Sequence, residues 1–379
     1  MQIGLHNFVE WSNRSGYKQI QFPLQKFREN ITEKYNFIDN IRIARQILLG
    51  QERDSPTLIE CTDIKIIVWN WDRDPNKHDY KYFFISKNND LLIDEPINSA
   101  FWLRYFPIFW SSENTLNIKD ECMSFYEELN FRKPPIFCGG HSQFAHWISD
   151  HLSNFFMSEE LNISCNKYLS SKLTAYQNEA LTSLNFDGGN SVLSLDIGSE
   201  LFRVYKCNKL YLIANYGVRD RFDLLRERIA KNYHFLQGEK ICYMPRGLIR
   251  GQKRISNEEE VINYCEKRGI EIADATYYSF RECINNFSKY SLFISGPSSA
   301  NTNFSLFSHQ NAHFIYGLAR SYERPDPAVA LGSSWYMLPK LNSTEIIFLE
   351  MANEDHSGYD DPVILDISLL ESKVAQFTK

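Results

Sequence analysis

The sequence lacks the patterns that mark several classes of protein. Its eight cysteines are dispersed and include no C-x-x-C pair, which argues against a zinc knuckle or a disulfide scaffold and favours reduced thiols. No apolar stretch approaches the roughly 18 residues of a membrane span, and residues 1–6 do not begin a secretory signal. We therefore expect neither secretion nor membrane insertion, and we expect the protein in the cytoplasm.

The sequence also has no excess of basic over acidic residues. The formal net charge of the 379 residues is −6, whereas nucleic-acid-binding proteins usually carry a strongly basic balance, so no nucleic-acid partner is expected. Hydrophobic residues make up 43% of the chain and aromatic residues 15%, which is enough apolar material for two cores. The composition predicts two globular domains and leaves the oligomeric state open.

The first half of the chain changes from a strand-like to a mixed pattern. Residues 1–130 are rich in strand-like runs, such as 64–69 and 82–86. From residue 134 the pattern becomes α/β, with a strand at 136–138, the pair Gly139-Gly140 and a helix over about 143–157. We predict an N-terminal domain over residues 1–235, with a β-rich entry at 1–130 and an α/β part from 134.

The second half alternates strands with helices. Strands are predicted at 240–244, 270–272 and 291–294, and Gly269 is expected to end the first helix between them. The two helices begin at segments that match capping boxes, Ser256-Asn257-Glu258-Glu259 and Ser279-Phe280-Arg281-Glu282. This alternation predicts a parallel sheet, whose ligands bind beyond the carboxyl ends of the strands. We assign residues 236–355 to a second domain and residues 356–379 to a C-terminal helix that returns toward the first.

One face of the helix after Gly139-Gly140 carries two groups suited to proton transfer. His146 and Asp150 lie one turn apart, close enough to hydrogen-bond, and a neutral imidazole oriented by a carboxylate can remove a proton from a hydroxyl. A solvated surface pair is the alternative. His141 and His146 are five residues apart and are not expected to share a face, which argues against a metal site. The other face is a predicted buried stripe of Phe144, Trp147, Ile148, Leu152, Phe155 and Phe156.

A basic loop and a glycine turn follow two of the predicted parallel strands. The loop carries Arg246, Arg250, Lys253 and Arg254, and guanidinium groups bind phosphate with two parallel hydrogen bonds. The turn at 296–299 offers backbone N–H groups and hydroxyls at a helix start. Because both follow carboxyl ends of parallel strands, we predict one diphosphate site; a solvated loop and an ordinary strand-to-helix turn are the alternatives. For Glu282 a capping role is favoured over a contact to a ribose diol.

These motifs resemble those of glycosyltransferase family 61. The resemblance covers about residues 60–375 and is carried by Arg246, Arg254, residues 256–260, 279–282 and 294–303, and by Gly139-Gly140 with the His146 to Asp150 helix. Bacterial members of this family act in capsular polysaccharide biosynthesis. Relatives include plant xylan glycosyltransferases and eukaryotic transferases that build O-linked N-acetylglucosamine and O-mannosyl glycans.

The resemblance implies a GT-B fold, in which two Rossmann-like domains face each other across a cleft. It implies an inverting transferase that uses a nucleotide-diphosphate sugar and no metal or other cofactor. His146 or Asp150 would face a hydroxyl of a capsular or similar polysaccharide, and a lipid-linked acceptor would bring the protein to the inner face of the membrane. Donor or diphosphate contacts are expected from Arg246, Arg250, Arg254, Glu282, Ser295, Gly296, Ser298, Ser299, Thr302 and Asn303.

Ser298 and Ser299 depart from the family pattern, which has His-Gly at these two positions. Hydroxyl groups still donate hydrogen bonds to phosphate, but loss of the imidazole leaves open a changed donor or a loss of turnover. The alternative function is therefore a non-catalytic GT-B-like protein that binds a nucleotide or a glycan.

Overall fold

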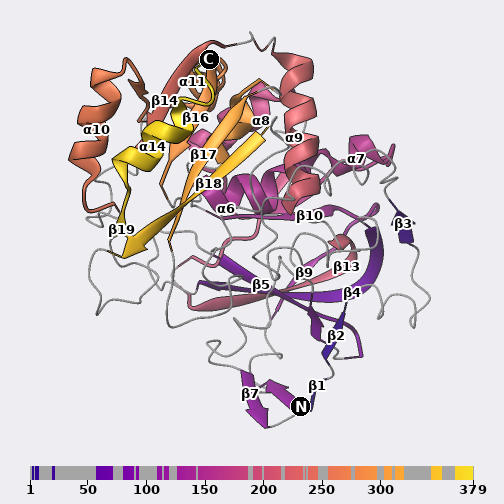
Figure 1. Cartoon of the computed structure of the whole chain (residues 1–379). Helices are drawn as coiled ribbons and strands as arrows, with labels where there is room; N and C mark the ends of the chain where they lie inside the picture. The colour runs from indigo at the N-terminus through magenta and orange to yellow at the C-terminus, as the bar shows by residue number, and fades with distance from the viewer. Residues whose placement is uncertain are drawn as a thin grey trace. The chain divides into compact units, whose positions relative to one another are not determined.

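Two long strands of the first half pair along almost their whole length (Figure 1). They are β4 (Thr57–Asn70) and β13 (Phe202–Ala214), which run antiparallel with Phe202 opposite Trp69. Their β-branched and aromatic residues suit a buried pleated surface, and Ile64, Ile66 and Val68 are fully buried. This computed structural model describes residues 2–3, 5–7, 19–21, 57–70, 80–88, 91–93, 109–112, 115–118, 126–141, 144–186, 191–198, 200–214, 218–233, 235, 238–245, 255–274, 278–296, 303–309, 312–319, 343–351 and 363–378.

The two long strands lie at the centre of a ten-stranded sheet with the order β12-β11-β10-β13-β4-β5-β6-β2, with β3 beside β4 and β9 beside β13. The strands β10, β11 and β12 are parallel, whereas β4, β5 and β6 are antiparallel. A separate sheet has the order β1-β8-β7. The further bounds are β1 (Gln2–Ile3), β2 (Leu5–Asn7), β3 (Gln19–Gln21), β5 (Tyr80–Ile85), β6 (Leu91–Ile93), β7 (Phe109–Ser112), β8 (Thr115–Ile118), β9 (Glu127–Leu129), β10 (Ile136–Gly139), β11 (Tyr168–Ser170) and β12 (Val192–Ser194).

The helix predicted over 143–157 changes its winding along its length. It starts as α6 (Phe144–His146), passes through a π-helical turn η2 (Trp147–His151) and a 3-10 turn η3 (Leu152–Phe156), and ends as α7 (Met157–Glu160). The predicted apolar stripe is confirmed from residue 147 onward, since Trp147, Ile148, Leu152, Phe155 and Phe156 are all buried. The next helix, α8 (Ala175–Ser183), starts at a capping box formed by Thr174 and Gln177.

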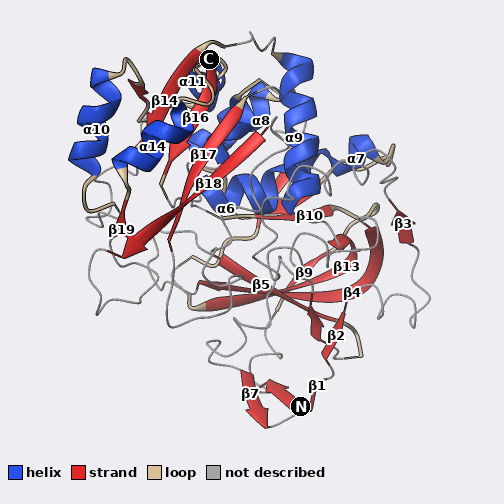
Figure 2. Ribbon diagram, in the orientation of Figure 1, coloured by secondary structure: helices blue, strands red, loops and turns tan. Residues whose placement is uncertain are grey.

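The second half forms a six-stranded sheet with the order β15-β14-β16-β17-β18-β19, and the mixed α/β fold predicted from the sequence is confirmed (Figure 2). Its strands are parallel from β15 to β18, and β19 is antiparallel to β18. The bounds are β14 (Lys240–Met244), β15 (Glu271–Ile272), β16 (Tyr290–Ser295), β17 (His313–Ala319), β18 (Ser343–Met351), β19 (Val363–Ile364), α10 (Glu258–Lys267), α11 (Phe280–Phe287), η5 (Ser305–Phe307) and α14 (Ile367–Val374).

Helices cover both faces of this parallel sheet. Leu292 and Ile294 of β16 belong to the core that α10 and α14 complete. Phe293 points to the opposite face, because successive strand residues alternate, and there its ring lies 6.1 Å from that of Phe287 in α11. The result is a three-layer α/β arrangement, with α14 contributing Leu370 and Val374 to the core of this half.

The two predicted helix starts have different outcomes. Ser279 and Glu282 form the predicted capping box of α11. The prediction at Ser256 is wrong, because Asn257 is the N-cap of α10 and makes no side-chain cap hydrogen bond. Instead the amide of Asn257 pairs with both backbone groups of Leu365, and Ser256 Oγ donates to the Val363 carbonyl. Tertiary contacts with the C-terminal segment have taken over the side chains that were expected to cap the helix.

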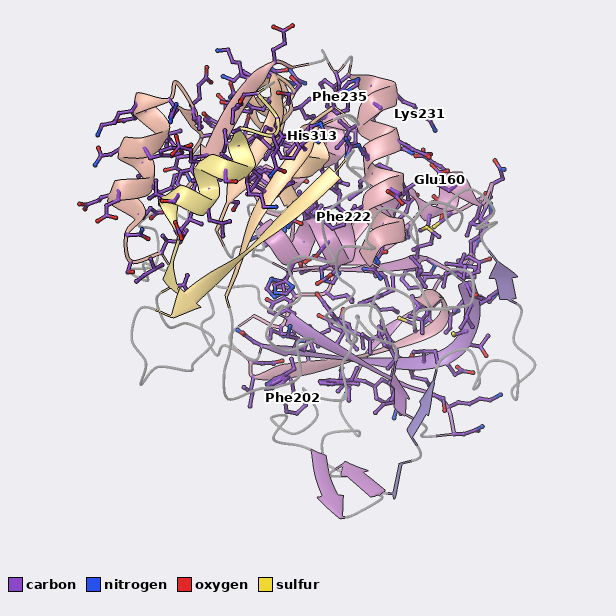
Figure 3. The ribbon with its side chains drawn as sticks, in the orientation of Figure 1. Glu160, Phe202, Phe222, Lys231, Phe235 and His313 are labelled. Atoms are coloured by element: carbon purple, nitrogen blue, oxygen red, sulfur yellow. The ribbon has the colours of Figure 1, made fainter. Side chains whose placement is uncertain are left out.

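The chain divides into two compact units, and the division falls between Arg221 and Phe222, inside α9 (Val218–Asn232). Figure 3 labels Phe222 and Lys231 toward the two ends of this helix. The first unit contains residues 53–221, and the second contains residues 222–379 with α14 in its core. The sequence placed the boundary at 235.

Two further observations concern the described helices and cysteines. Among the described helices, none combines the length and the apolar character that crossing a bilayer requires. The seven cysteines that the structure describes all carry free thiols, and six of them are buried. Burial raises the pKa of Cys207 and Cys265 to about 12, so these two thiols stay protonated.

Candidate active site

The turn after β10 brings the helix that carries His146 close to the sheet. Gly139 has φ +72°, and a Cβ atom there would lie 2.5 Å from His151 Nδ1. A Cβ atom on Gly140 would overlap the hydroxyl of Ser171. The Gly139 carbonyl accepts a hydrogen bond from Ser170 Oγ at 2.6 Å. Only residues without a side chain allow the helix to approach this closely.

Replacing Gly139 by alanine is a direct test of this packing. The new methyl group would meet the imidazole of His151, and a left-handed backbone is strained for alanine, by about 1–2 kcal/mol. We expect the melting temperature to fall by several degrees and turnover to fall with it. Gly198→Ala is the matched control, since Gly198 also has positive φ but nothing lies within 4 Å of its Cβ position. Equal losses in both variants would show that backbone strain, and not contact with His151, explains the effect.

His146 and Asp150 form the predicted contact. His146 Nδ1 lies 3.0 Å from Asp150 Oδ2, and the side chains are 39% and 15% exposed. The other carboxylate oxygen, Oδ1, accepts a hydrogen bond from Ser149 Oγ at 2.8 Å. An ionised carboxylate can only accept, so Nδ1 of His146 carries the proton and Nε2 keeps its lone pair. This is the tautomer that a general base needs.

The carboxylate of Asp150 is held in its ionised form. Burial alone would raise its pKa, but the hydrogen bond from His146 and the charges of His146, His151 and Arg221 together hold the pKa well below its usual range. Asp150 therefore remains an acceptor near neutral pH. It can orient the imidazole and stabilise the imidazolium that forms when Nε2 takes up a proton.

Two further histidines surround this pair, and the sequence expectation for one of them is wrong. The ring of His141 lies 4.8 Å from that of His146, because His141 belongs to the loop after β10 and not to the helix. Burial, then the charges of His146, Lys81 and His151, lower the pKa of His141 to about 2. Among the described residues, no three His, Cys, Asp or Glu side chains are grouped to hold a metal ion.

The second of these histidines, His151, was missed by the sequence analysis. Burial lowers its pKa to about 4, against the opposing charge of Asp150. Its Nδ1 lies 3.2 Å from the carbonyl oxygen of Cys138, so Nδ1 donates and the ring is a neutral donor. A signal for its burial was present, since His151 follows Trp147 by four residues along the apolar stripe.

Two buried side chains hold the backbone of Asp150. Arg221 Nη1 donates a hydrogen bond to the Asp150 carbonyl oxygen, and Arg221 is 0% exposed. Asn154 Nδ2 donates to the same carbonyl at 3.3 Å and to the Cys138 carbonyl at 3.2 Å. Arg221 lies 71 residues from Asp150 in the chain, and no local pattern points to it.

Four of the predicted donor residues are among the described residues of the second unit: Glu282, Ser295, Gly296 and Asn303. Ser295 is buried at the carboxyl end of β16, and its Oγ donates to the Gly296 carbonyl at 2.9 Å. A Cβ atom on Gly296 would lie 2.5 Å from the Ile255 side chain. Asn303 is fully buried. Glu282 is exposed and accepts from the Ser279 backbone N–H at 2.8 Å, which lowers its pKa, so its described contact is the cap.

The remaining predicted donor residues lie outside the described residues: Arg246, Arg250, Arg254, Ser298, Ser299 and Thr302. Lys253, which the sequence places in the same basic segment, lies outside them as well. The strands that precede them are described. β14 ends at Met244 and β16 at Ser295, and these two residues are paired in the parallel register. Both strands therefore have their carboxyl ends at the same edge of the sheet, which is where ligands of parallel sheets bind.

A known protein family resembles part of this chain. Residues 144–315 match the family model described as Glycosyltransferase 61. The matched segment contains His146 and Asp150 in the first unit and the edge of β14 and β16 in the second. No curated protein matches the chain. The resemblance to glycosyltransferase family 61 that the sequence shows is confirmed over residues 144–315.

Proposed function

We propose that the protein is an inverting glycosyltransferase of the GT-B type that needs no metal. It moves a sugar from a nucleotide-diphosphate donor to a hydroxyl of a capsular or similar surface polysaccharide. The observation that carries the proposal is the contact between His146 Nδ1 and Asp150 Oδ2, which leaves Nε2 of a half-exposed imidazole ready to accept a proton. The match of residues 144–315 to the Glycosyltransferase 61 family model supports the transferase class.

The chemical step is a displacement at the anomeric carbon. The acceptor oxygen forms a bond to C1 as the bond from C1 to the diphosphate oxygen breaks, and the electron pair leaves with the diphosphate. The acceptor proton passes to Nε2 of His146, and the anomeric configuration inverts because attack comes from the face opposite the leaving group. General-base assistance of this kind contributes about 10²- to 10⁴-fold to the rate.

His146 suits the role of base better than Asp150. Both carboxylate oxygens of Asp150 already accept hydrogen bonds, from Ser149 and His146, and its side chain is the less exposed of the two. A carboxylate whose pKa is held this low is a weak proton acceptor. We therefore assign proton transfer to His146 and orientation to Asp150.

We assign donor binding to the edge of the second unit's sheet where β14 and β16 end. Residues 246–254 and 297–302 follow the paired ends of β14 and β16, and a basic loop there would neutralise the charge that develops on the diphosphate. With a three-layer α/β sheet in the second unit, this supports a Rossmann-like donor domain and hence the GT-B assignment. Arg246 is the residue we assign to the diphosphate.

Arg246→Ala is expected to lower kcat by about 10²- to 10³-fold, since it removes one electrostatic stabiliser of the leaving group. We expect the melting temperature to stay within about 1 °C of the wild type, as for most substitutions away from a core. Lys231→Ala, an exposed cation on α9, is the matched control and should retain full activity. Full activity of Arg246→Ala would remove the diphosphate assignment.

A screen with UDP-, GDP-, CMP- and dTDP-sugars tests the function as a whole. Thermal stabilisation by one donor, followed by its hydrolysis or transfer, supports the transferase. Stabilisation without turnover supports the alternative of a non-catalytic nucleotide-binding protein, which the Ser298-Ser299 departure motivates. If no nucleotide sugar stabilises the protein, the transferase and the nucleotide-binding alternative both fail, and only the glycan-binding form of the alternative is left.

A further inference from the structure

A buried arginine contacts the backbone of the proposed catalytic pair. Arg221 of α9 is 0% exposed, and its Nη1 donates to the carbonyl oxygen of Asp150. Taking a guanidinium out of water is costly, so its place in the core calls for a compensating role. The contact is directed at the one residue of the helix whose carboxylate orients His146.

The arginine acts where the helix changes its winding. Asp150 lies in the π-helical turn η2, just before the 3-10 turn η3, and such insertions alter which backbone groups pair. The Asp150 carbonyl accepts side-chain hydrogen bonds from Arg221 and from Asn154. Two donors on one carbonyl fix the position of the Asp150 backbone, and therefore the point from which its carboxylate reaches His146.

The charge of Arg221 also matches the protonation states of its neighbours. The groups around Asp150 are His146, Ser149, His151 and Asn154 on its own helical segment, His141 from the loop after β10 and Arg221 from α9. The guanidinium favours an ionised Asp150 and a neutral His151. The ionised Asp150 can only accept from Nδ1 of His146, and in a neutral ring this leaves Nε2 unprotonated.

We propose that Arg221 is a positioning residue for glycosyl transfer. It holds the backbone of Asp150, and Asp150 in turn holds the His146 ring in the tautomer that accepts the acceptor proton. The kinetic consequence rests on the proposed function, whereas the consequence for the His146 ring does not.

The first experiment needs no substrate. Protein labelled with ¹⁵N in its nine histidines reports the tautomer of each ring by NMR, with His146→Ala used to assign its signals. For the wild type we expect His146 with a protonated Nδ1 and an unprotonated Nε2. For Arg221→Met we expect a mixture of tautomers at His146, because the Asp150 carbonyl then keeps only the hydrogen bond from Asn154 and the nearby positive charge is lost. Unchanged His146 signals would overturn the proposal.

Arg226→Met provides the matched control. Arg226 lies on the same helix, is 9% exposed and donates to a backbone carbonyl, that of Ser308, in the second unit. Its loss removes a buried guanidinium of the same kind without touching Asp150. We expect Arg226→Met to lower stability about as much as Arg221→Met and to leave the His146 signals unchanged. Arg221→Gln, which keeps an N–H donor, replaces Arg221→Met if the latter does not fold.

The second experiment is a double-mutant cycle with the donor that the nucleotide-sugar screen identifies. Arg221→Met is expected to lower kcat by about 10- to 100-fold with little change in KM, since a small misplacement of a catalytic group costs that much. In a His146→Ala background the same substitution is expected to change kcat less than about twofold, because Arg221 acts through His146.

The outcomes separate this inference from the proposed function. Equal losses of kcat in both backgrounds would mean a merely structural arginine and would overturn the inference. Full activity of His146→Ala would refute the base assignment, and the NMR result would still decide whether Arg221 positions Asp150. Loss of activity in His146→Ala with none in Arg221→Met would overturn the inference alone.

Discussion

His146→Ala is expected to lower kcat by about 10²- to 10⁴-fold while leaving the melting temperature within a few degrees of the wild type. The rate effect is the usual contribution of a general base. The stability effect is small because the side chain is 39% exposed and fills little of the core. Initial rates of sugar transfer under saturating donor and acceptor measure the first, and thermal unfolding measures the second.

Asp150→Asn separates orientation from proton transfer. An amide in place of the carboxylate keeps the volume but can donate to His146 Nδ1, which favours the tautomer with a protonated Nε2. We expect this variant to lose activity almost as fully as His146→Ala, and the double variant to be no worse than either single one. Glu159→Ala, an exposed acidic residue at the end of the same helix, serves as the control with full activity.

Additive losses in His146→Ala and Asp150→Asn would contradict this pairing. So would an Asp150→Asn variant that stays fully active. Either result would return the two residues to the solvated surface pair that the sequence also permits.

The stability of the protein is expected to fall steeply as the pH drops from 7 to 5. His141 and His151 have folded pKa values of about 2 and about 4, below the 6.5 of an unfolded histidine. The unfolded state therefore binds more protons than the folded state throughout this window, so stability rises with pH and is lost as pH falls. Each ring costs about 2 kcal/mol over these two pH units, which makes about 4 kcal/mol together as an upper estimate.

Asp150 does not add to this slope. Its pKa is depressed from 3.8, so its contribution to stability is fully present above that value and is lost only at more acidic pH. The titration between pH 7 and 5 thus isolates the two buried histidines from the carboxylate beside them.

Thermal unfolding at pH 7, 6 and 5 measures the effect. For a unit of this size about 4 kcal/mol corresponds to a fall in melting temperature of roughly 10 °C. The double variant His141→Phe, His151→Asn removes both titrating rings and keeps a donor for the Cys138 carbonyl. We expect it to be less stable at pH 7 but to have a much flatter pH dependence. Parallel curves for the two proteins would mean that the rings already take up protons in the folded state.

Local pattern predicted many of the elements. The strands and helices of the second half follow from alternation and from Gly269, which has φ +70° at the end of α10. The capping box at Ser279 and the contact of His146 with Asp150 depend on residues three or four apart. Such spacings fix which side chains meet on a helix, whatever the rest of the chain does.

Tertiary contacts decided what local pattern could not. Asparagine is a residue type that often caps a helix with its side chain. The Asn257 amide nevertheless pairs with Leu365, 108 residues away, and the capping box expected at Ser256 does not form. The rings of His141 and His146 lie side by side although His141 precedes the helix and the two residues are five apart. Neither outcome is encoded in spacing, since each depends on which segments pack together.

The sequence by itself determined the resemblance to a glycosyltransferase family over residues 144–315, the α/β class and a histidine and an aspartate one helical turn apart. Only the tertiary structure decided how that pair is held: by Arg221 from a distant helix and between two neutral, buried histidines. The physical reason is the distance along the chain over which each effect acts. Helical periodicity acts over a few residues and can be seen in the chain, whereas burial, pKa and the choice of hydrogen-bond partner depend on surroundings that exist only once the chain has folded.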